Sequence, residues 1–436
     1  MIFKLWAARR QFIIRSSVAA VIAALGLPAA QAYGSKPPSG TSSASLAADP
    51  GLHHGLASKY PGDVGLASDS AVVFSEDFEQ GAVSDVSNRW TSTNNKDESV
   101  LSLITENAPG SPGKRSLMMT GTKGHDTGGD LWKRLDKGYD QLYARFYVKF
   151  APDAPYVHHF VALGGKTSTA PYPEGSAGIR PTGYNRFGTS MDLGRSNADP
   201  PGAWFFYTYW CEMRSWQTEA GEPDGRPNPY YGNGFGPDVP EQAKRGEWQC
   251  VELMIKLNSA PDKRDGEQAF WVDGKLVSRW ATGTYKGTWF RDSFHRNDFF
   301  DTNPQPFEGF LWSKTEELKI NYFWLQYYLA SVFEENLRPA NPDILYNDNV
   351  ARVQFDNVVL ATRYIGPIAT AADSSETGFD FNRDGRASTA DVIQMLKMRQ
   401  ADPQDMRTDY NGDGRLTLLE VLDFLLDVLR GKVHSG

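Results

Sequence analysis

Hydrophobic and polar residues alternate with a period of two through the middle of the chain. Short runs rich in aromatic and β-branched residues are separated by Gly, Pro, Asn and Asp clusters, which is typical of β-strands joined by turns. The runs are LYARFYVKF, AWFFYTYWCEM, QCVELMIKL, QAFWVDGKLVSRW, INYFWLQYY and VQFDNVVLATRYI. Asp273-Gly274 lies inside one of these runs and favours a tight hairpin turn. Residues 71–366 are therefore predicted to form a mainly β domain, built as a two-sheet sandwich.

A different pattern occupies residues 377–434. The segments DFNRDGRASTAD and DYNGDGRLTLLE are each followed by hydrophobic residues at helical spacing. Both carry oxygen-bearing side chains at loop positions 1, 3, 5, 9 and 12, glycine at position 6, and arginine at position 7, where only the backbone carbonyl would bind. The predicted ligands are Asp380, Asn382, Asp384, Arg386, Ser388 and Asp391 in the first loop, and Asp409, Asn411, Asp413, Arg415, Thr417 and Glu420 in the second. Because Ca²⁺ prefers about six to eight oxygen ligands, the sequence predicts two calcium sites.

The two loops lack an entering helix. The stretch TAADSSETGF before the first loop has no helical periodicity, so each unit consists of a loop and the helix that follows. This arrangement resembles the type I dockerin domain of bacterial polysaccharide-degrading enzymes. The resemblance implies a small module that folds with Ca²⁺ and docks onto a cohesin-like protein. Glu420 stands where the family usually has Asp, so a private partner or a purely structural calcium domain is the alternative.

The N-terminal end is predicted to be a targeting segment. Within residues 1–32, Arg9-Arg10 precedes the apolar run SVAAVIAALGLPAA and the small-residue stretch AQA, as in a signal peptide, with the arginine pair typical of the twin-arginine type. The apolar run is too short to span a membrane. Residues 33–70 and 367–376 are predicted to be flexible linkers. We therefore expect an exported protein, periplasmic, extracellular or attached to the cell surface, with no membrane span after cleavage.

Net charge and cysteine content bear on two further questions, nucleic-acid binding and a disulfide. The formal net charge is −8 and no basic run is present, so the sequence gives no indication of nucleic-acid binding. Cys211 and Cys250 are the two cysteines. An exported protein can join them in a disulfide, and two buried free thiols are the alternative.

The order of parts in residues 71–366 resembles the concanavalin A-like jelly roll. An opening EDFEQG segment, an internal WVDGKLV hairpin and a closing FDNVVLATRYIG strand carry this likeness. On YDQLYARFYVKF, HHFVALGG and KINYFWLQYY, the stretch also resembles bacterial jelly-roll polysaccharide lyases, nearest to polysaccharide lyase family 14 and the glucuronan lyases. The resemblance implies a β-jelly-roll sandwich that cleaves a polysaccharide by β-elimination.

Alternate positions of three predicted strands carry aromatic and polar side chains on one face. Such a face suits a sugar-binding groove, because aromatic rings stack on sugar rings while Arg, Lys and Gln bind hydroxyl or carboxylate groups. The predicted substrate-binding residues are Tyr143, Tyr147, Lys149, Glu252, Tyr322 and Trp324. A strand face in contact with solvent is the alternative.

Elimination from a uronic acid requires three groups. The C5 carboxylate must be neutralised, the C5 proton removed and the leaving oxygen protonated. The predicted catalytic residues are Arg145, His158, His159, Gln326 and Tyr328, with one histidine of the pair as the base. The alternative is a pair of loop histidines bonded to backbone. The chain lacks the Gln-Ile-His and Tyr-x-Lys-Ala-Gly motifs of the well-known alginate lyases.

Two other functions stay open at this point. Hydrolysis needs two carboxyl groups about 5–5.5 Å or roughly 6.5–9.5 Å apart, and Glu212 and Glu252 lie on predicted strands that could pair them. A non-catalytic carbohydrate-binding protein would need the aromatic residues but no base.

Overall fold

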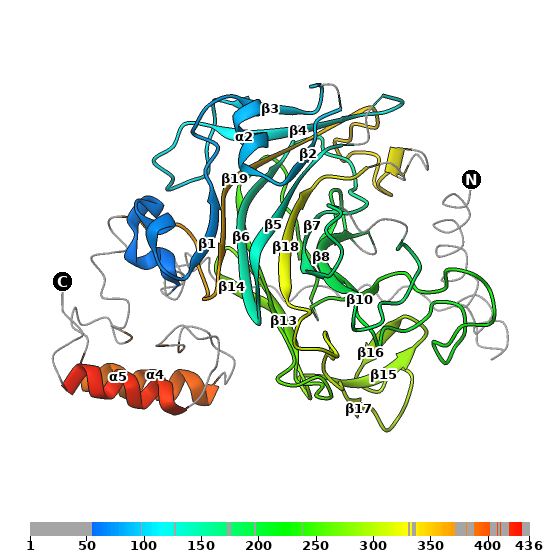
Figure 1. Ribbon diagram of the computed structural model, residues 1–436, viewed down its shortest axis with the longest axis vertical. Coiled ribbons are helices and arrows are strands. Elements are labelled where there is room, and N and C mark those ends of the chain that lie inside the picture. Colours follow the sequence, from blue (N-terminus) through cyan, green and yellow to red (C-terminus); the bar gives the residue numbers. More distant parts are fainter. Residues whose placement is uncertain are drawn as a thin grey trace, which may run out of the picture.

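Two β-sheets pack face to face and confirm the predicted mainly β sandwich (Figure 1). The computed structural model describes residues 55–96, 98–125, 128–171, 176–195, 198–237, 239–329, 332–333, 337–370, 381, 388–401, 408, 410 and 418–429. The N-terminal segment that resembles a signal peptide lies outside these residues. In the part of the chain that the structure describes, no helix is long and apolar enough to cross a membrane.

The smaller sheet, here called sheet A, holds the first and last strands of the sandwich. In the described residues it has eight strands. Their order is β14 (Lys275–Trp280), β13 (Glu267–Val272), β12 (Gln249–Lys256), β6 (Gln141–Phe150), β19 (Val350–Ala361), β4 (Ser116–Thr122) and β3 (Leu101–Ile104), with β1 (Val72–Glu76) paired to β19.

The larger sheet, sheet B, has eleven strands among the described residues. Their order is β17 (Gln305–Pro306), β15 (Lys286–Phe290), β16 (Ser293–Arg296), β10 (Asn233–Phe235), β9 (Ala203–Tyr209), β8 (Arg186–Gly194), β7 (Val161–Lys166), β18 (Ile320–Gln326), β5 (Asp130–Tyr139) and β2 (Ser92–Asn94), with β11 (Glu241–Gln242) paired to β9. Neighbouring strands run antiparallel in both sheets, except that β10 and β16 are parallel.

The predicted strands appear where the period-two pattern placed them. Each of the six aromatic runs contains a strand, and the run with the turn dipeptide forms the β13–β14 hairpin. Asp273 and Gly274 have φ angles of 51° and 78°, which are the positive values that a tight hairpin turn requires.

The core lies between the two sheets. Alternate residues of β6, from Leu142 to Phe150, point into it and are almost fully buried. Aromatic rings join the sheets, with centroids 5.1 Å apart between Phe206 and Phe270 and 5.4 Å apart between Phe160 and Phe355. Burial of this apolar area is the main contribution to the stability of the domain.

The other face of sheet A is covered by the chain itself. The segment η1 (Leu56–Lys59), η2 (Pro61–Asp63) and η3 (Leu66–Ser68) packs on it, so the linker expected over residues 33–70 is wrong from residue 55 onward. The Ala57 amide donates to the Ile365 carbonyl over 2.9 Å. A Cβ on Gly55 would lie 2.1 Å from that same carbonyl oxygen, so only glycine fits at this contact.

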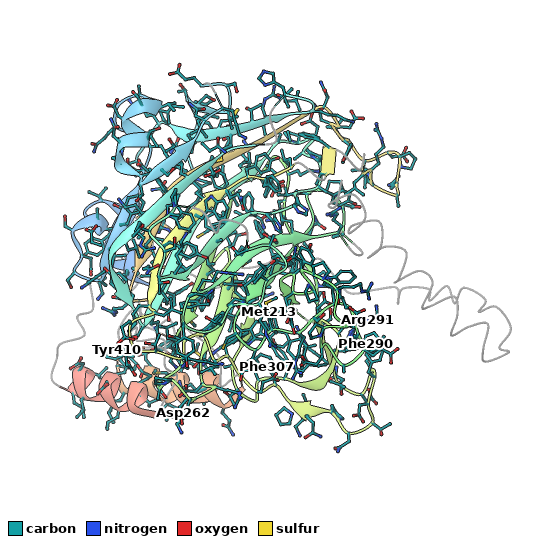
Figure 2. The ribbon with its side chains drawn as sticks, turned by 45° about the vertical axis from the view of Figure 1, so that its right-hand side comes forward. Met213, Asp262, Phe290, Arg291, Phe307 and Tyr410 are labelled. Atoms are coloured by element: carbon teal, nitrogen blue, oxygen red, sulfur yellow. The ribbon has the colours of Figure 1, made fainter. Side chains whose placement is uncertain are left out.

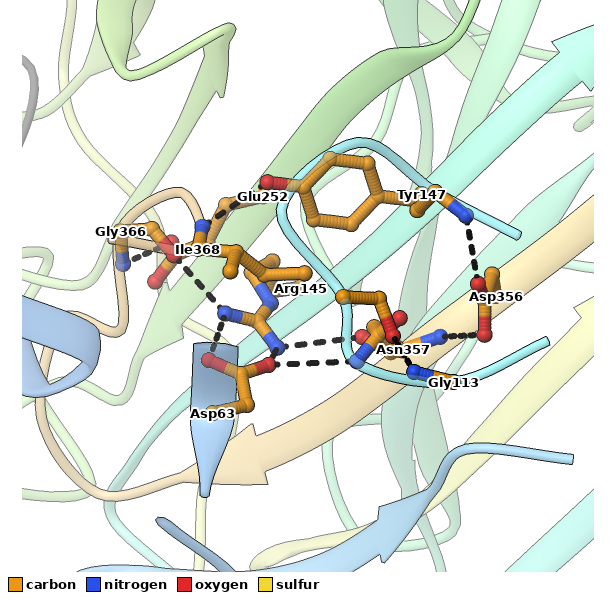
Figure 3. A network of polar contacts seen from close by, with 11 residues as sticks. Asp63, Gly113, Arg145, Tyr147, Glu252, Asp356, Asn357, Gly366 and Ile368 are labelled. Carbon is orange, nitrogen blue, oxygen red and sulfur yellow. Dashed lines mark hydrogen bonds and ion pairs between the residues drawn. The ribbon is translucent and has the colours of Figure 1, made fainter. Parts of the chain in front are cut away.

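A buried ion pair fixes this cover in place (Figure 3). Arg145 is fully buried and forms a salt bridge with Asp63 of η2. Its guanidinium also donates to the carbonyl oxygens of Gly366 at 3.1 Å and Asn357 at 3.3 Å. These contacts occupy the guanidinium of Arg145, which the sequence predicts to bind substrate.

Neighbouring groups on this face hold the segment that follows β19. Glu252 accepts hydrogen bonds of 2.8 Å from the amides of Ile365 and Gly366, and the Tyr147 hydroxyl accepts one of 2.8 Å from Ile368. Burial raises the pKa of Glu252 to about 7 and raises the pKa of Tyr147 well above its usual value. Residues 367–369 therefore belong to the domain and not to a linker.

The two cysteines are free thiols, so the disulfide expectation is wrong and the alternative of buried thiols is right. Cys211 donates to the Leu311 carbonyl at 3.1 Å. Burial raises the pKa of Cys211 to about 11 and raises the pKa of Cys250 as well.

Two helices follow the predicted calcium loops. They are α4 (Thr389–Ala401) and α5 (Leu418–Leu429), and they pack on each other through Val392, Met395, Val421 and Phe424. The prediction of a helix after each loop is confirmed. Loop residues 382–387 and 411–417, together with Asp380 and Asp409, lie outside the described residues.

The buried ion pair generates the first prediction. Arg145→Met would leave the Asp63 carboxylate without its cation, so we expect the free energy of unfolding to fall by about 3–5 kcal/mol, measured by denaturant unfolding. Lys149→Met, on the same strand face but in a half-exposed pair with Glu106, should cost about 0–1 kcal/mol. Equal losses from the two variants would contradict a structural role for Arg145.

Candidate active site

The face of sheet B that points away from the core carries a row of side chains across its strands. The register pairs Trp132 with Trp324, Trp324 with Ala162, Ala162 with Ser190 and Ser190 with Tyr207. Paired residues of adjacent strands lie side by side on one face of a sheet. We call this sequence of residues the outer row. It contains the predicted substrate-binding residue Trp324.

A register shift beside the outer row brings the histidine pair onto the same face. Trp324 of β18 pairs with Ala162. Tyr328 lies four residues after Trp324, but it bridges to His159, which lies only three residues before Ala162. The register is therefore shifted by one residue. The shift resembles a β-bulge, which re-aims side chains at the end of a ladder. As a result Phe160 stays in the core, while His159 keeps 30% of its side chain exposed.

His159 is held in one orientation by a buried carboxylate. Its Nδ1 lies 2.7 Å from Oδ2 of Asp192, which is 2% exposed. The other carboxylate oxygen accepts a 2.8 Å hydrogen bond from the Phe160 amide. With Nδ1–H donating to Asp192, Nε2 carries the lone pair. A carboxylate that orients imidazole in this way is a common arrangement for a histidine base.

Two tyrosine rings flank this imidazole. The centroid of the Tyr207 ring lies 5.1 Å from that of His159, and the Tyr328 ring lies 6.1 Å away with its plane tilted by only 10°. These residues come from β9 and from the chain just after β18. The arrangement therefore places two phenol groups, each able to donate a proton, close to one histidine.

His158 has a different environment. Its ring centroid lies 4.1 Å from that of His159, and its Nδ1 is buried with no hydrogen-bond partner. Burial, reinforced by the nearby His159 and Arg195, lowers the pKa of His158 well below 6.5. His158 is consequently a neutral imidazole at ordinary pH and a weak base.

A pocket of about 220 Å³ opens next to this cluster. It is lined by Asn94, Lys96, Gly128, Gly129, Asp130, Trp324, Gln326, Tyr327 and Tyr328. The predicted catalytic residues Gln326 and Tyr328 thus share a pocket with Lys96 and Asp130. An amide and a cation can bind a sugar carboxylate, and the acidic side chain can accept hydrogen bonds from sugar hydroxyls.

Tyr322 lies on the same face of sheet B as the outer row and packs against it. Its ring stacks on Trp132 with centroids 4.4 Å apart, and burial raises its pKa to about 12. The ring extends over glycines of two neighbouring strands. A Cβ on Gly164 or Gly188 would lie 2.5 Å or 2.4 Å from the Tyr322 hydroxyl. Tyr322 is therefore a packed support for the site, protonated at ordinary pH.

The structure separates the predicted residues into two groups. His158, His159, Gln326, Tyr328, Tyr322 and Trp324 lie together on the outer face of sheet B. The prediction that Arg145, Tyr143, Tyr147, Lys149 and Glu252 line the same site is wrong, because they lie on the covered face of sheet A. The alternation on their strands was correct, but the polar face is buried under the chain.

The carboxylate pair of the hydrolase alternative does not form. Glu252 is buried on sheet A and holds backbone amides of the chain after β19. Glu212 follows β9 and makes a bidentate ion pair with Arg264, with Nη2–Oε1 at 2.6 Å. The two carboxyl groups are thus committed to different structural contacts.

Sequence reasoning missed several residues of the site. Asp192 and Tyr207 stand at outer-face positions of the period-two patterns in RFGTSMDLG and AWFFYTY, and that alternation is the signal that could have found them. Asn94 and Lys96 lie on β2 and the turn after it, and no motif marks them.

The residues that the structure describes near the calcium loops fit a cation. Asp391 and Glu420, at the twelfth position of each loop, are 0% and 1% exposed. Oδ2 of Asp391 accepts a 2.8 Å hydrogen bond from the Ser388 amide, as in a helix capping box. Among the described residues alone, no group of three or more His, Cys, Asp or Glu is placed to hold a metal ion.

Comparison with known proteins does not show a family for this chain. No protein-family model matches the chain. No curated protein sequence matches it either. Among solved structures, alginate lyase vAL-1 from Chlorella virus is similar, with 14% identity, a TM-score of 0.42, and coverage of 66% of this chain and 99% of that chain. The endo-β-1,4-glucuronan lyase from the fungus Trichoderma reesei gives 14% identity, a TM-score of 0.38, and coverage of 69% and 100%.

The packing of Tyr322 generates the second prediction. Gly188→Ala would push a methyl group against the Tyr322 hydroxyl, so we expect a loss of about 1–3 kcal/mol in the free energy of unfolding. Adding Tyr322→Phe removes the clashing oxygen and should restore most of that loss. The hydroxyl makes only a 3.5 Å contact with the Phe187 carbonyl, so Tyr322→Phe alone should cost little. Failure of the double variant to recover would show that Gly188 is needed for another reason.

Proposed function

We propose that this protein is an exported polysaccharide lyase that cleaves a uronic-acid-containing chain by β-elimination. The observation that carries the proposal is the His159–Asp192 pair, in which the partly exposed His159 ring lies beside Tyr328 on the outer face of sheet B. A non-catalytic sugar-binding protein needs aromatic rings, but it has no use for a histidine oriented by a buried carboxylate.

We infer one role for each group in this reaction. Nε2 of His159 takes the C5 proton, the released electron pair forms the C4–C5 double bond, and the C4–oxygen bond breaks. The Tyr328 hydroxyl protonates the leaving oxygen. Gln326 and Lys96, in the adjoining pocket, stabilise the charge that develops on the C5 carboxylate. No water enters the product.

His159, and not His158, is the proposed base. Asp192 fixes the His159 tautomer and stabilises the imidazolium that forms when the ring accepts a proton. His158 has a pKa held well below 6.5 by burial, and protonating it would place a charge in an environment without a carboxylate partner. We assign His158 to packing against His159.

The C-terminal residues 377–434 are proposed to be a calcium module with a docking role. The buried Asp391 and Glu420 at the starts of the helices support two Ca²⁺ sites, and the cation would neutralise carboxylates that otherwise repel one another. Apolar side chains also remain exposed on both helices. They are Ile393 and Leu396 on α4 and Leu422 and Leu429 on α5. Such residues suit contact with a cohesin-like partner protein.

The third prediction tests the reaction. His159→Ala should lower kcat by about 10²–10⁴ and Gln326→Ala by about 10²–10³, measured on uronate polymers through the ultraviolet absorption of the unsaturated product. His158→Gln should have a much smaller effect. Arg145→Lys, away from the site, should leave KM unchanged.

Alternative functions give different results in the same assay. Reducing ends that appear without an ultraviolet product would indicate hydrolysis and contradict the lyase. Polymer binding with neither signal would leave a binding protein. Full activity of His159→Ala would remove His159 as the base.

The fourth prediction concerns calcium. Chelation of the full-length protein should reduce helical circular dichroism as the C-terminal module unfolds, and added Ca²⁺ should restore it. The β-sandwich should keep its own melting transition, because all the predicted calcium ligands lie in residues 377–434, outside that domain. Asp384→Ala with Asp413→Ala should reproduce the chelator spectrum. A spectrum insensitive to both treatments would contradict the calcium sites.

A further inference from the structure

An exposed group of aromatic side chains lies on the small lobe formed by β15, β16 and β17. Phe299 is 75% exposed and Phe300 is 47% exposed. Phe300 stacks on Phe290 with centroids 4.7 Å apart and planes at 8°, and Phe299 stacks on His295 at 5.6 Å and 13°. We call these four residues the aromatic platform. Figure 2 shows Phe290 at the border of the molecule, with Phe307 further inside.

The platform is not required by the packing of its own lobe. Other residues of the same hairpin, Trp289 and Phe294, point to the opposite face and pack with Phe307, which is fully buried. The lobe therefore has a satisfied apolar core. Exposed phenylalanines on its other face cost solubility, so their presence indicates a ligand.

The register shows that the platform continues the outer row of the candidate active site. Tyr207 pairs with Gly234 of β10, Gly234 pairs with Ser293 of β16, and Ser293 pairs with Phe290 of β15. Paired residues lie on the same face of a sheet. Thus Phe290 faces the same side as Tyr207, whose ring contacts His159. Phe290 lies three strands from Tyr207, which is about 14 Å at about 4.8 Å per strand.

Charges of both signs lie next to the platform, because Asp298 and Asp301 flank Phe299 and Phe300 in the sequence and a cation lies beside Phe290. The Arg291 guanidinium lies 5.3 Å from the centre of the Phe290 ring, and Arg291 is the first residue of the turn between β15 and β16. A flat ring next to a guanidinium matches a sugar ring that bears a carboxylate. The same pairing of a cation and an aromatic ring recurs toward the active site, where Arg186 lies 5.2 Å from the Tyr209 ring.

We propose that the aromatic platform is a distal binding site for the polysaccharide chain, which holds a part of the polymer beyond the sugars at His159. The inference rests on the proposed function for the identity of the ligand. The rings stack on sugar faces in several orientations, so the platform increases affinity for long chains without selecting the bond that is cleaved. Short oligosaccharides that occupy only the catalytic cluster do not reach it.

The test separates polymer binding from catalysis. In a His159→Ala background, which prevents cleavage, binding to alginate, glucuronan and a neutral β-glucan is measured by affinity electrophoresis. Phe299→Ala with Phe300→Ala should weaken binding to the uronate polymer by roughly 5- to 100-fold, the size expected for losing two ring contacts. Phe299→Tyr with Phe300→Tyr, which keeps both rings, should bind nearly as well as the parent.

Kinetics and association state complete the test. With His159 intact, the alanine pair should raise KM for the polymer and leave kcat/KM for the shortest cleaved oligosaccharide unchanged. Unaltered polymer binding by the alanine pair overturns the platform even if the protein is a lyase. Polymer binding that depends on the platform, without an ultraviolet product, supports the platform while the lyase proposal fails. Sedimentation velocity tests self-association. If the parent protein is a dimer that the alanine pair converts to monomers, and polymer binding is unchanged, the platform serves self-association and the inference is overturned.

Discussion

The ion pair between Arg145 and Asp63 is the interaction on which the arrangement of this protein depends. Arg145 sits in the middle of β6, hydrogen-bonded between β12 and β19, and its side chain is 0% exposed. A guanidinium buried without a carboxylate would cost several kcal/mol. The chain before β1 and the chain after β19 must therefore fold over sheet A to supply the carboxylate and carbonyl partners. Sheet A is closed on both sides, so the candidate site lies on sheet B.

The sequence predicted the strands well, because apolar and polar side chains must alternate along a half-buried strand. They do so in β6, β12 and β18. It could not say which alternate face is open to a ligand. Tyr, Arg and Lys on one side of β6 look the same whether that side meets sugar, water or protein. The deciding partner, Asp63, lies 82 residues away from Arg145 in a segment whose composition is typical of a linker. Contacts of that separation are not encoded in local periodicity.

The candidate site was predictable in part, for a similar reason. His158 and His159 stand out because histidine is rare in this chain, and Gln326 and Tyr328 share one strand face. Asp192, which makes His159 a plausible base, comes from a different strand and meets it only through the register of sheet B. The one-residue shift between β18 and the segment before β7 is also a tertiary feature. Analysis of each strand by itself could identify candidate side chains, but it could not show which of them contact one another.

Sheet B separates stability from recognition along each of its strands. In β8, Phe187 and Met191 face the shared core, whereas Ser190 and Asp192 face outward beside His159. Because successive side chains point to opposite faces, the outer positions can change without opening a cavity in the core. In the lyase proposed above, rigid strands and a buried carboxylate hold the base, and binding relies on flat rings that tolerate variation in the sugar. Substrate preference in such a protein can therefore diverge while the sandwich that positions His159 stays the same.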